Sequence, residues 1–136
     1  MYGKRGQVST EYTIATGVLL VFLVFTISFS YDRVNETIRT GKLANSLETI
    51  DRSVDSIYML GQGSREIISM DLPKGIESII INNTIFNVKM TSFGSVADFY
   101  LEPPAGSYLF GNLSYSEGMH YISIEMINST DINISE

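Results

Sequence analysis

The sequence predicts an α+β fold, in which a long N-terminal helix is followed by a small, mostly antiparallel β-sheet domain. The first observation is an uncharged, apolar run of 20 residues from Tyr12 to Tyr31. The second is a stretch from Asp32 to Leu60 in which apolar residues recur at steps of three and four, as on one helix face. The third is a change of period to two from Glu66 onward, which is typical of half-buried strands.

The apolar run is long enough to cross a membrane. At about 1.5 Å per residue, a helix of this length spans roughly 30 Å, which is the thickness of a bilayer's hydrocarbon layer. Eleven of its 20 residues are Ile, Val, Leu or Phe, so insertion is favourable, and the alternative of a soluble core helix is weaker. Lys4 and Arg5 precede the run, and because positive charge favours the cytoplasmic side, residues after Asp32 are expected outside. A removable secretory signal fits less well, since no small-residue cleavage site follows the run.

A short motif stands at the start of the run. Gly6, Gln7, Ser9, Glu11 and Tyr12 give the form Gly-Gln-x-Ser-x-Glu-Tyr, directly after the basic pair. The order of basic pair, motif and apolar helix resembles the class III signal peptide of type IV pilins, in its archaeal version. The bacterial version usually has Phe where Gln7 stands. The resemblance implies a pilin-like lollipop fold, with the helix as the stick and the β domain as the head.

The resemblance also implies roles for three residues. Gly6 would precede the cut made by a membrane-embedded prepilin peptidase, and Gln7 would become the new N-terminus. Glu11 would meet the N-terminal ammonium of a neighbouring subunit, in agreement with the high cost of an unpaired carboxylate among packed apolar helices. A solvated position at the cytoplasmic interface is the alternative for Glu11. An assembly ATPase and a polytopic membrane platform protein are the further partners that the resemblance implies.

The predicted organisation has four parts. Residues 1–6 form the leader, residues 7–31 the hydrophobic transmembrane or filament-core helix, residues 32–62 its amphipathic continuation, and residues 63–136 a β-rich head domain. Within the continuation, Gly41 is a predicted weak point, and glycines just after Leu60 are expected to end the helix. The apolar positions of the continuation are Val34, Ile38, Leu43, Leu47, Ile50, Val54 and Ile57.

Six or seven short strands are expected after the helix, with one face packed on it. Alternating apolar residues that predict buried strand faces are Phe86, Val88, Met90, Ala97, Phe99, Leu101, His120, Ile122, Ile124, Met126, Ile132 and Ile134. Turn residues separate the strands at Pro73-Lys74-Gly75, Asn82-Asn83, Pro103-Pro104, Gly111-Asn112 and Glu117-Gly118.

Asparagine usage is the second informative feature. The chain has eight asparagines, and five begin the acceptor pattern N-x-S/T: Asn35, Asn82, Asn112, Asn128 and Asn133. Ser and Thr make up about a fifth of the chain, so chance predicts only roughly one or two. All five follow the apolar run, on the side expected outside the cell, and are candidates for N-glycosylation. The alternative is that loops rich in Asn, Ser and Thr form the pattern by accident.

No catalytic constellation is present in the sequence, and no enzyme activity, metal or cofactor is expected. The chain lacks cysteine, which excludes thiol chemistry, and its net charge of −6 with no basic patch beyond the leader disfavours nucleic-acid binding. His120, the sole histidine, is expected to be a satisfied or edge residue of a strand. Glu48, Asp51 and Asp55 share a helical stripe, which suits a solvated face better than a cation site. Packing is the default expectation, against a sugar-binding surface, for Tyr58, Tyr100, Tyr108, Tyr115 and Tyr121.

The leading hypothesis is a pilin, the structural subunit of an archaeal type IV pilus-like filament for adhesion or surface attachment. The precursor would lie in the membrane with its N-terminus in the cytoplasm, and the mature chain would form a homo-oligomeric extracellular filament. A single-span, membrane-anchored extracellular binding protein is the alternative, and a minor or tip pilin is a further one. Sequence pattern does not separate a pilus from a related secretion-type filament.

Overall fold

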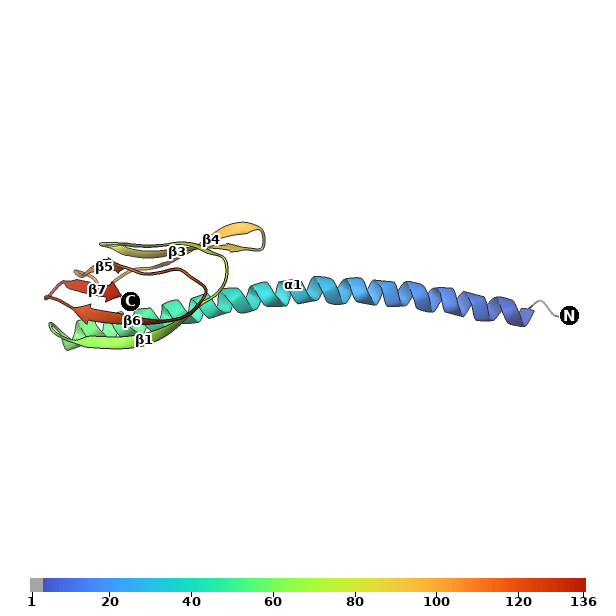
Figure 1. Ribbon diagram of the computed structural model, residues 1–136, viewed down its shortest axis with the longest axis horizontal. Helices are drawn as coiled ribbons and strands as arrows, with labels where there is room; N and C mark the ends of the chain where they lie inside the picture. Colours follow the sequence, from blue (N-terminus) through green and yellow to red (C-terminus); the bar gives the residue numbers. More distant parts are fainter. Residues whose placement is uncertain (1–3) are drawn as a thin grey trace. The chain divides into compact units, whose positions relative to one another are not determined.

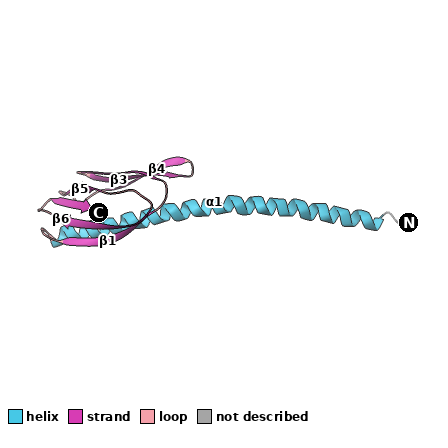
Figure 2. Cartoon of the chain, viewed as in Figure 1, coloured by secondary structure: helices cyan, strands magenta, loops and turns pink. Residues whose placement is uncertain are grey.

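The structure is a computed structural model that describes residues 4–136, so the start of the predicted leader lies outside the described residues. One helix, α1 (Lys4–Leu60), is followed by seven strands (Figures 1 and 2). The strands are β1 (Arg65–Leu72), β2 (Ile76–Asn82), β3 (Ile85–Ser92), β4 (Ser95–Leu101), β5 (Tyr108–Asn112), β6 (Gly118–Met126) and β7 (Asp131–Ser135). The predicted α+β class, with a long N-terminal helix and a β domain, is confirmed.

The chain divides into two compact units, one ending at Asn35 and the other running from Glu36 to Glu136. The first unit is helical, and every residue from Ser9 to Asn35 is exposed within the chain. Its length and composition make α1 one candidate membrane span. The second unit contains the remainder of α1 and all seven strands. The helix is not interrupted at Gly41, the predicted weak point.

The strands form two sheets, one of four strands in the order β1-β6-β7-β5 and one of three in the order β2-β3-β4. Every neighbouring pair is antiparallel except β5 and β7, which run parallel. β5 and β7 can run parallel because β6 lies between them in the sequence and runs in the opposite direction, antiparallel to β7. In Figure 1, β1 and β6 lie along the last turns of α1.

One hydrophobic core joins α1 to the inner faces of both sheets. The helix contributes Leu43, Leu47, Ile50, Val54 and Ile57, all buried. The strands contribute their alternate residues, among them Phe86, Val88, Met90, Ile122, Ile124, Ile132 and Ile134. The alternation predicted from the sequence therefore marks the buried face correctly. Val34 and Ile38, the first positions of the predicted helix stripe, are instead 55% and 52% exposed.

Glycines end the helix, as predicted. Gly61 and Gly63 both have a φ of 85°, a conformation that L side chains rarely adopt. The amide of Gly61 donates to the carbonyl of Ile57 at 3.0 Å, and the hydroxyl of Ser64 donates to the same carbonyl at 3.0 Å. Both bonds satisfy the carbonyl of Ile57, one of the last four of the helix, where the chain turns toward β1.

The predicted turn at Gly111-Asn112 is wrong, because both residues belong to β5. Gly111 has a φ of 143°, and a Cβ placed on it would collide with the backbone carbonyl of Ile134 on β7. The glycine is therefore needed for the close approach of two parallel strands rather than for a turn.

Candidate functional site

Three side-chain hydroxyls in the apolar segment of α1 bond to the backbone of the helix itself. The hydroxyl of Thr13 donates to the carbonyl of Ser9 at 2.9 Å, that of Thr26 to the carbonyl of Phe22 at 2.9 Å, and that of Ser30 to the carbonyl of Thr26 at 2.8 Å. A hydroxyl bonded one turn back suits a medium without water, because the helix then satisfies it internally. The surface that this segment presents is consequently apolar, with large side chains such as Phe22 and Phe25 both 73% exposed.

The residues of the signal motif lie at the start of this helix. Gly6 and Gln7 belong to the first turns of α1, and Glu11 is exposed within the single chain. Gly17 has open space around the position of a Cβ, so the small-residue face it shares with Ser9 and Thr13 is free to accept another helix. Cleavage at Gly6 and the pairing of Glu11 remain predictions.

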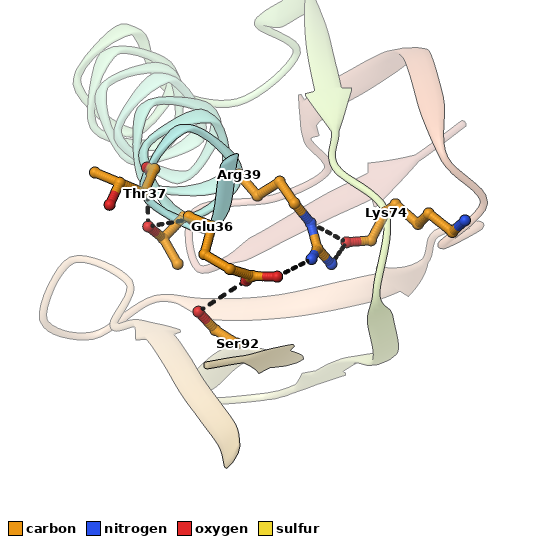
Figure 3. Close-up of polar contacts among 6 residues, drawn as sticks. Glu36, Thr37, Arg39, Lys74 and Ser92 are labelled. Carbon is orange, nitrogen blue, oxygen red and sulfur yellow. Dashed lines mark hydrogen bonds and ion pairs between the residues drawn. The ribbon is translucent and has the colours of Figure 1, made fainter. Parts of the chain in front are cut away.

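A polar latch, made of Glu36, Arg39, the Lys74 carbonyl and Ser92, fixes α1 where the second unit begins. The Arg39 guanidinium bonds the Glu36 carboxylate at 2.5 Å, and its Nε and Nη2 both donate to the carbonyl of Lys74, the Nε at 3.0 Å. The other carboxylate oxygen of Glu36 accepts from Ser92 at 3.4 Å. Figure 3 shows both helix side chains reaching toward the strands.

The sequence alone does not predict this latch. The i,i+3 spacing of Glu36 and Arg39 is common on any helix. The acceptor that distinguishes Arg39 is a backbone carbonyl 35 residues away, in the connection between β1 and β2. No local pattern encodes such a partner.

Removing the Arg39 side chain is expected to destabilise the second unit. Arg39→Ala should cost about 1–2 kcal/mol of unfolding free energy, because it deletes charge-assisted bonds to a carbonyl and leaves Glu36 without its cation. Urea unfolding of the full chain in mild detergent measures the change. The matched control is Arg52→Ala, whose i,i+4 pair with Glu48 is largely exposed and should cost only about 0.3–0.5 kcal/mol. Equal losses in the two variants would contradict the latch.

The five acceptor asparagines occupy different environments. Asn35 is exposed on α1, Asn82 is exposed at the end of β2, and Asn112 is exposed at the end of β5. Asn133 is half-buried on β7, on the face opposite the core. Asn128 is half-buried in the turn between β6 and β7.

The side chain of Asn128 is bonded through both its amide nitrogen and its carbonyl oxygen inside its own turn. Its amide nitrogen donates to the Asp131 carboxylate at 2.6 Å. Its carbonyl oxygen accepts from the amide and hydroxyl of Thr130, at 2.9 and 3.0 Å, and from the amide of Asp131 at 2.8 Å. This is an Asx turn, in which the asparagine closes the hairpin. The acceptor nitrogen therefore has a structural role.

His120 forms the best-defined ion pair of the β domain. Its Nδ1 lies 2.6 Å from the Glu136 carboxylate, and its Nε2 lies 2.8 Å from the carbonyl of Ser116. Because both ring nitrogens face acceptors, the geometry favours the doubly protonated imidazolium. The hydrogen bond that His120 donates to Glu136 is the main cause that raises the pKa of His120 above its ordinary 6.5, while burial opposes it. The same bond lowers the pKa of Glu136 below 4.5. The expectation of a satisfied histidine is confirmed.

This pair predicts a pH-dependent contribution to stability. Because the pKa of His120 is raised in the folded state, its ion pair stabilises the fold below pH 6.5, and this stabilisation is lost as the pH rises through the folded-state pKa. Because the pKa of Glu136 is lowered in the folded state, its carboxylate stabilises the fold above pH 4.5, and this stabilisation is lost as the pH falls through the folded-state pKa. The stabilisation is therefore largest between pH 4.5 and 6.5.

Urea unfolding across pH 4 to 9 of the wild type and of His120→Gln checks this expectation. The difference in unfolding free energy between them should be largest in that window and decline at higher pH. A difference that does not change with pH would refute the ion pair.

The acidic stripe of α1 behaves as a solvated face. Glu48 pairs with Arg52 at 2.5 Å, and both side chains are mostly exposed. Burial, followed by repulsion from Asp55 and Glu48, raises the pKa of Asp51. Among residues 4–136 no group of three or more metal-ligating side chains comes together.

The tyrosines differ from expectation. Tyr58 packs against the core, and its hydroxyl bonds the carbonyl of Ala105 at 3.3 Å. The other four stand on the surface, with exposures of 68% for Tyr100, 45% for Tyr108, 54% for Tyr115 and 69% for Tyr121. The prediction that they are packing residues is wrong for these four, because each falls on the outward face of its strand or in a loop.

No protein-family model matches the chain, and no match was found among curated proteins or solved structures. The architecture itself, a long apolar N-terminal helix followed by a small β domain, is consistent with a pilin-like protein.

Proposed function

We propose that the protein is a pilin, the structural subunit of an archaeal type IV pilus-like extracellular filament that serves adhesion or surface attachment. One observation carries the proposal. The most apolar stretch of α1 is not buried by any other part of the chain. This stretch directly follows the motif from Gly6 to Tyr12. Such a helix requires lipid or other helices around it, and a filament subunit has first one and then the other.

Before assembly the precursor is a single-span membrane protein with a cytoplasmic N-terminus. A prepilin peptidase cuts between Gly6 and Gln7 and removes Lys4 and Arg5, the charges that hold the helix in its orientation. The helix then exchanges lipid for neighbouring helices. Since both media are apolar, the net hydrophobic gain is small, and close packing together with the pairing of Glu11 supplies the specificity.

The partners of the mature protein are further copies of itself and the machinery that assembles them. Head-to-tail contacts that do not close on themselves generate a filament of identical subunits. An assembly ATPase and a membrane platform protein drive extrusion, and no nucleic acid or cofactor takes part. The β domains form the outer surface of the filament, on which exposed tyrosines such as Tyr100 and Tyr121 are available for attachment.

A membrane-anchored extracellular binding protein is the second candidate, and a surface hollow favours it. The hollow measures about 500 Å³ and lies between the β1–β2 connection and the loop before β6. Its lining includes Lys74, Tyr115 and Glu117, a mixture of charge and aromatic surface. A minor or tip pilin is a variant of the first proposal.

Immunogold electron microscopy with antibodies against residues 63–136 tests the proposal. Labelling along the length of surface filaments, absent from a deletion strain, is the expected result. Labelling confined to filament ends would indicate a tip pilin. Labelling of the cell envelope without filaments would support the anchored binding protein and refute the filament subunit.

A further inference from the structure

Three acceptor asparagines that are far apart in the sequence come together around β5. Asn112 is the last residue of this strand. Asn133 on β7 is in register with Phe110 of β5. The turn that begins with Asn82 also reaches β5, because the carbonyl of Asn83 accepts from the amide of Leu109 at 2.8 Å.

Two exposed aromatic rings lie in the middle of this cluster. Tyr108, Phe110 and Asn112 are alternate residues of β5 and point to the same face, away from the buried Leu109. Tyr108 is 45% exposed and Phe110 is 40% exposed. Residues two apart on a strand are roughly 7 Å apart, so a sugar attached to Asn112 reaches the Phe110 ring.

We infer that Asn82 and Asn112 carry N-linked oligosaccharides, that Asn35, Asn128 and Asn133 do not, and that the sugar on Asn112 covers Phe110 and Tyr108. The inference deepens the proposed function, since it rests on export of the β domain. It also implies that this face of the four-stranded sheet is turned to solvent in the filament, and that subunit contacts lie elsewhere.

The local structure separates the five sites. Modified asparagines are expected in exposed loops and at strand ends, where the backbone can enter the active site of the enzyme that transfers the oligosaccharide. Asn82 opens a two-residue hairpin turn, and Asn112 is followed by the irregular segment before β6. Asn35 is held in a helix. Asn133 lies in a strand paired on both sides, opposite Phe110 and Glu125.

Asn128 is excluded for a chemical reason. Transfer requires its amide nitrogen to attack the anomeric carbon of an oligosaccharide linked to a lipid phosphate. The new bond joins that carbon to the nitrogen, the carbon–oxygen bond to phosphate breaks, and the nitrogen loses a proton while the lipid phosphate leaves with the electron pair. In Asn128 this nitrogen already donates to Asp131 at 2.6 Å, and the amide closes the turn.

Intact-mass and glycopeptide mass spectrometry of the protein from the cells that make it tests the assignment. Ser114→Ala and Thr84→Ala, which remove the acceptor hydroxyls of two sites but keep their asparagines, should each lower the mass by one oligosaccharide. The matched controls Ser114→Thr and Thr84→Ser keep the pattern and should keep the oligosaccharide, so that their mass changes only by one methylene group. Ser135→Ala, which abolishes the Asn133 pattern, should change the mass only by the lost oxygen.

Hydroxyl-radical footprinting tests the covering of the rings. Oxidation of Phe110 and Tyr108 should increase in Ser114→Ala relative to wild type, whereas Tyr100 on the other sheet should be unchanged. Unmodified Asn82 and Asn112 in protein recovered from surface filaments would overturn the inference and leave the proposed function standing. Modified Asn82 and Asn112 on a protein that is confined to the membrane would support the inference and contradict the proposed function. An oligosaccharide on Asn128 would also overturn the assignment.

Discussion

Lysine in place of Val21 is expected to abolish surface filaments. Val21 lies near the middle of the apolar segment and is 59% exposed within the chain, and under the proposed function lipid or neighbouring helices cover it. A lysine at the centre of a membrane helix costs about 2.5–3.5 kcal/mol on insertion scales, and the same charge has no partner in a packed helix bundle. Filament yield after shearing, compared with total protein by immunoblot, measures the loss.

Two controls separate this effect from misfolding. Val21→Leu keeps the apolar surface and should assemble normally. Asn45→Lys places the same charge on an exposed position of α1 within the second unit and should also assemble. Filaments made by Val21→Lys at wild-type yield would show that this segment is not enclosed by apolar surroundings in the assembled state.

Alanine in place of Ile50 is expected to bring the β domain close to unfolding. Ile50 is fully buried at the centre of the helix stripe that faces both sheets. Truncation of such a residue typically costs about 2–5 kcal/mol, from lost transfer free energy and the cavity left behind. Because domains are stable by only about 5–15 kcal/mol, this is a large share of the total.

Urea unfolding of the full chain in mild detergent, followed by circular dichroism, measures the change. The matched control is Ile38→Ala on the same helix, where the side chain is 52% exposed and the cost should be within about 0.5 kcal/mol. Similar losses for the two variants would mean that the helix stripe does not join the core as described.

The elements with a regular period were predictable from the sequence. The alternation of Phe86, Val88 and Met90 marks the buried face of β3, because a strand exposes and buries successive residues. The stripe from Leu43 to Ile57 marks the buried face of α1 for the same reason at a period of 3.6. Long-range pairing carries no such period. The parallel alignment of β5 with β7 and the role of Gly111 in it were therefore missed.

The candidate sites likewise fall into those set by local patterns, which could be predicted, and those set by residues distant in the chain, which could not. The apolar helix, its motif and the acceptor asparagines are local patterns, so the sequence displays them. Arg39 was missed because its acceptor, the carbonyl of Lys74, is distant in the chain. The pairing of His120 with Glu136 was missed for the same reason, although the buried position of the histidine followed from alternation. The convergence of Asn82, Asn112 and Asn133 on β5 emerges only when the strands are assembled.

The most direct test of the filament proposal is the intact mass of the subunit in sheared surface filaments. The proposal predicts a chain that begins at Gln7, carries any attached oligosaccharide, and retains the whole apolar helix. A free amine at Gln7 is the form that can pair with Glu11, whereas a cyclised pyroglutamyl end would support the cleavage and contradict that pairing. A chain that begins after residue 31, or the uncut chain found solely in the membrane, would contradict it.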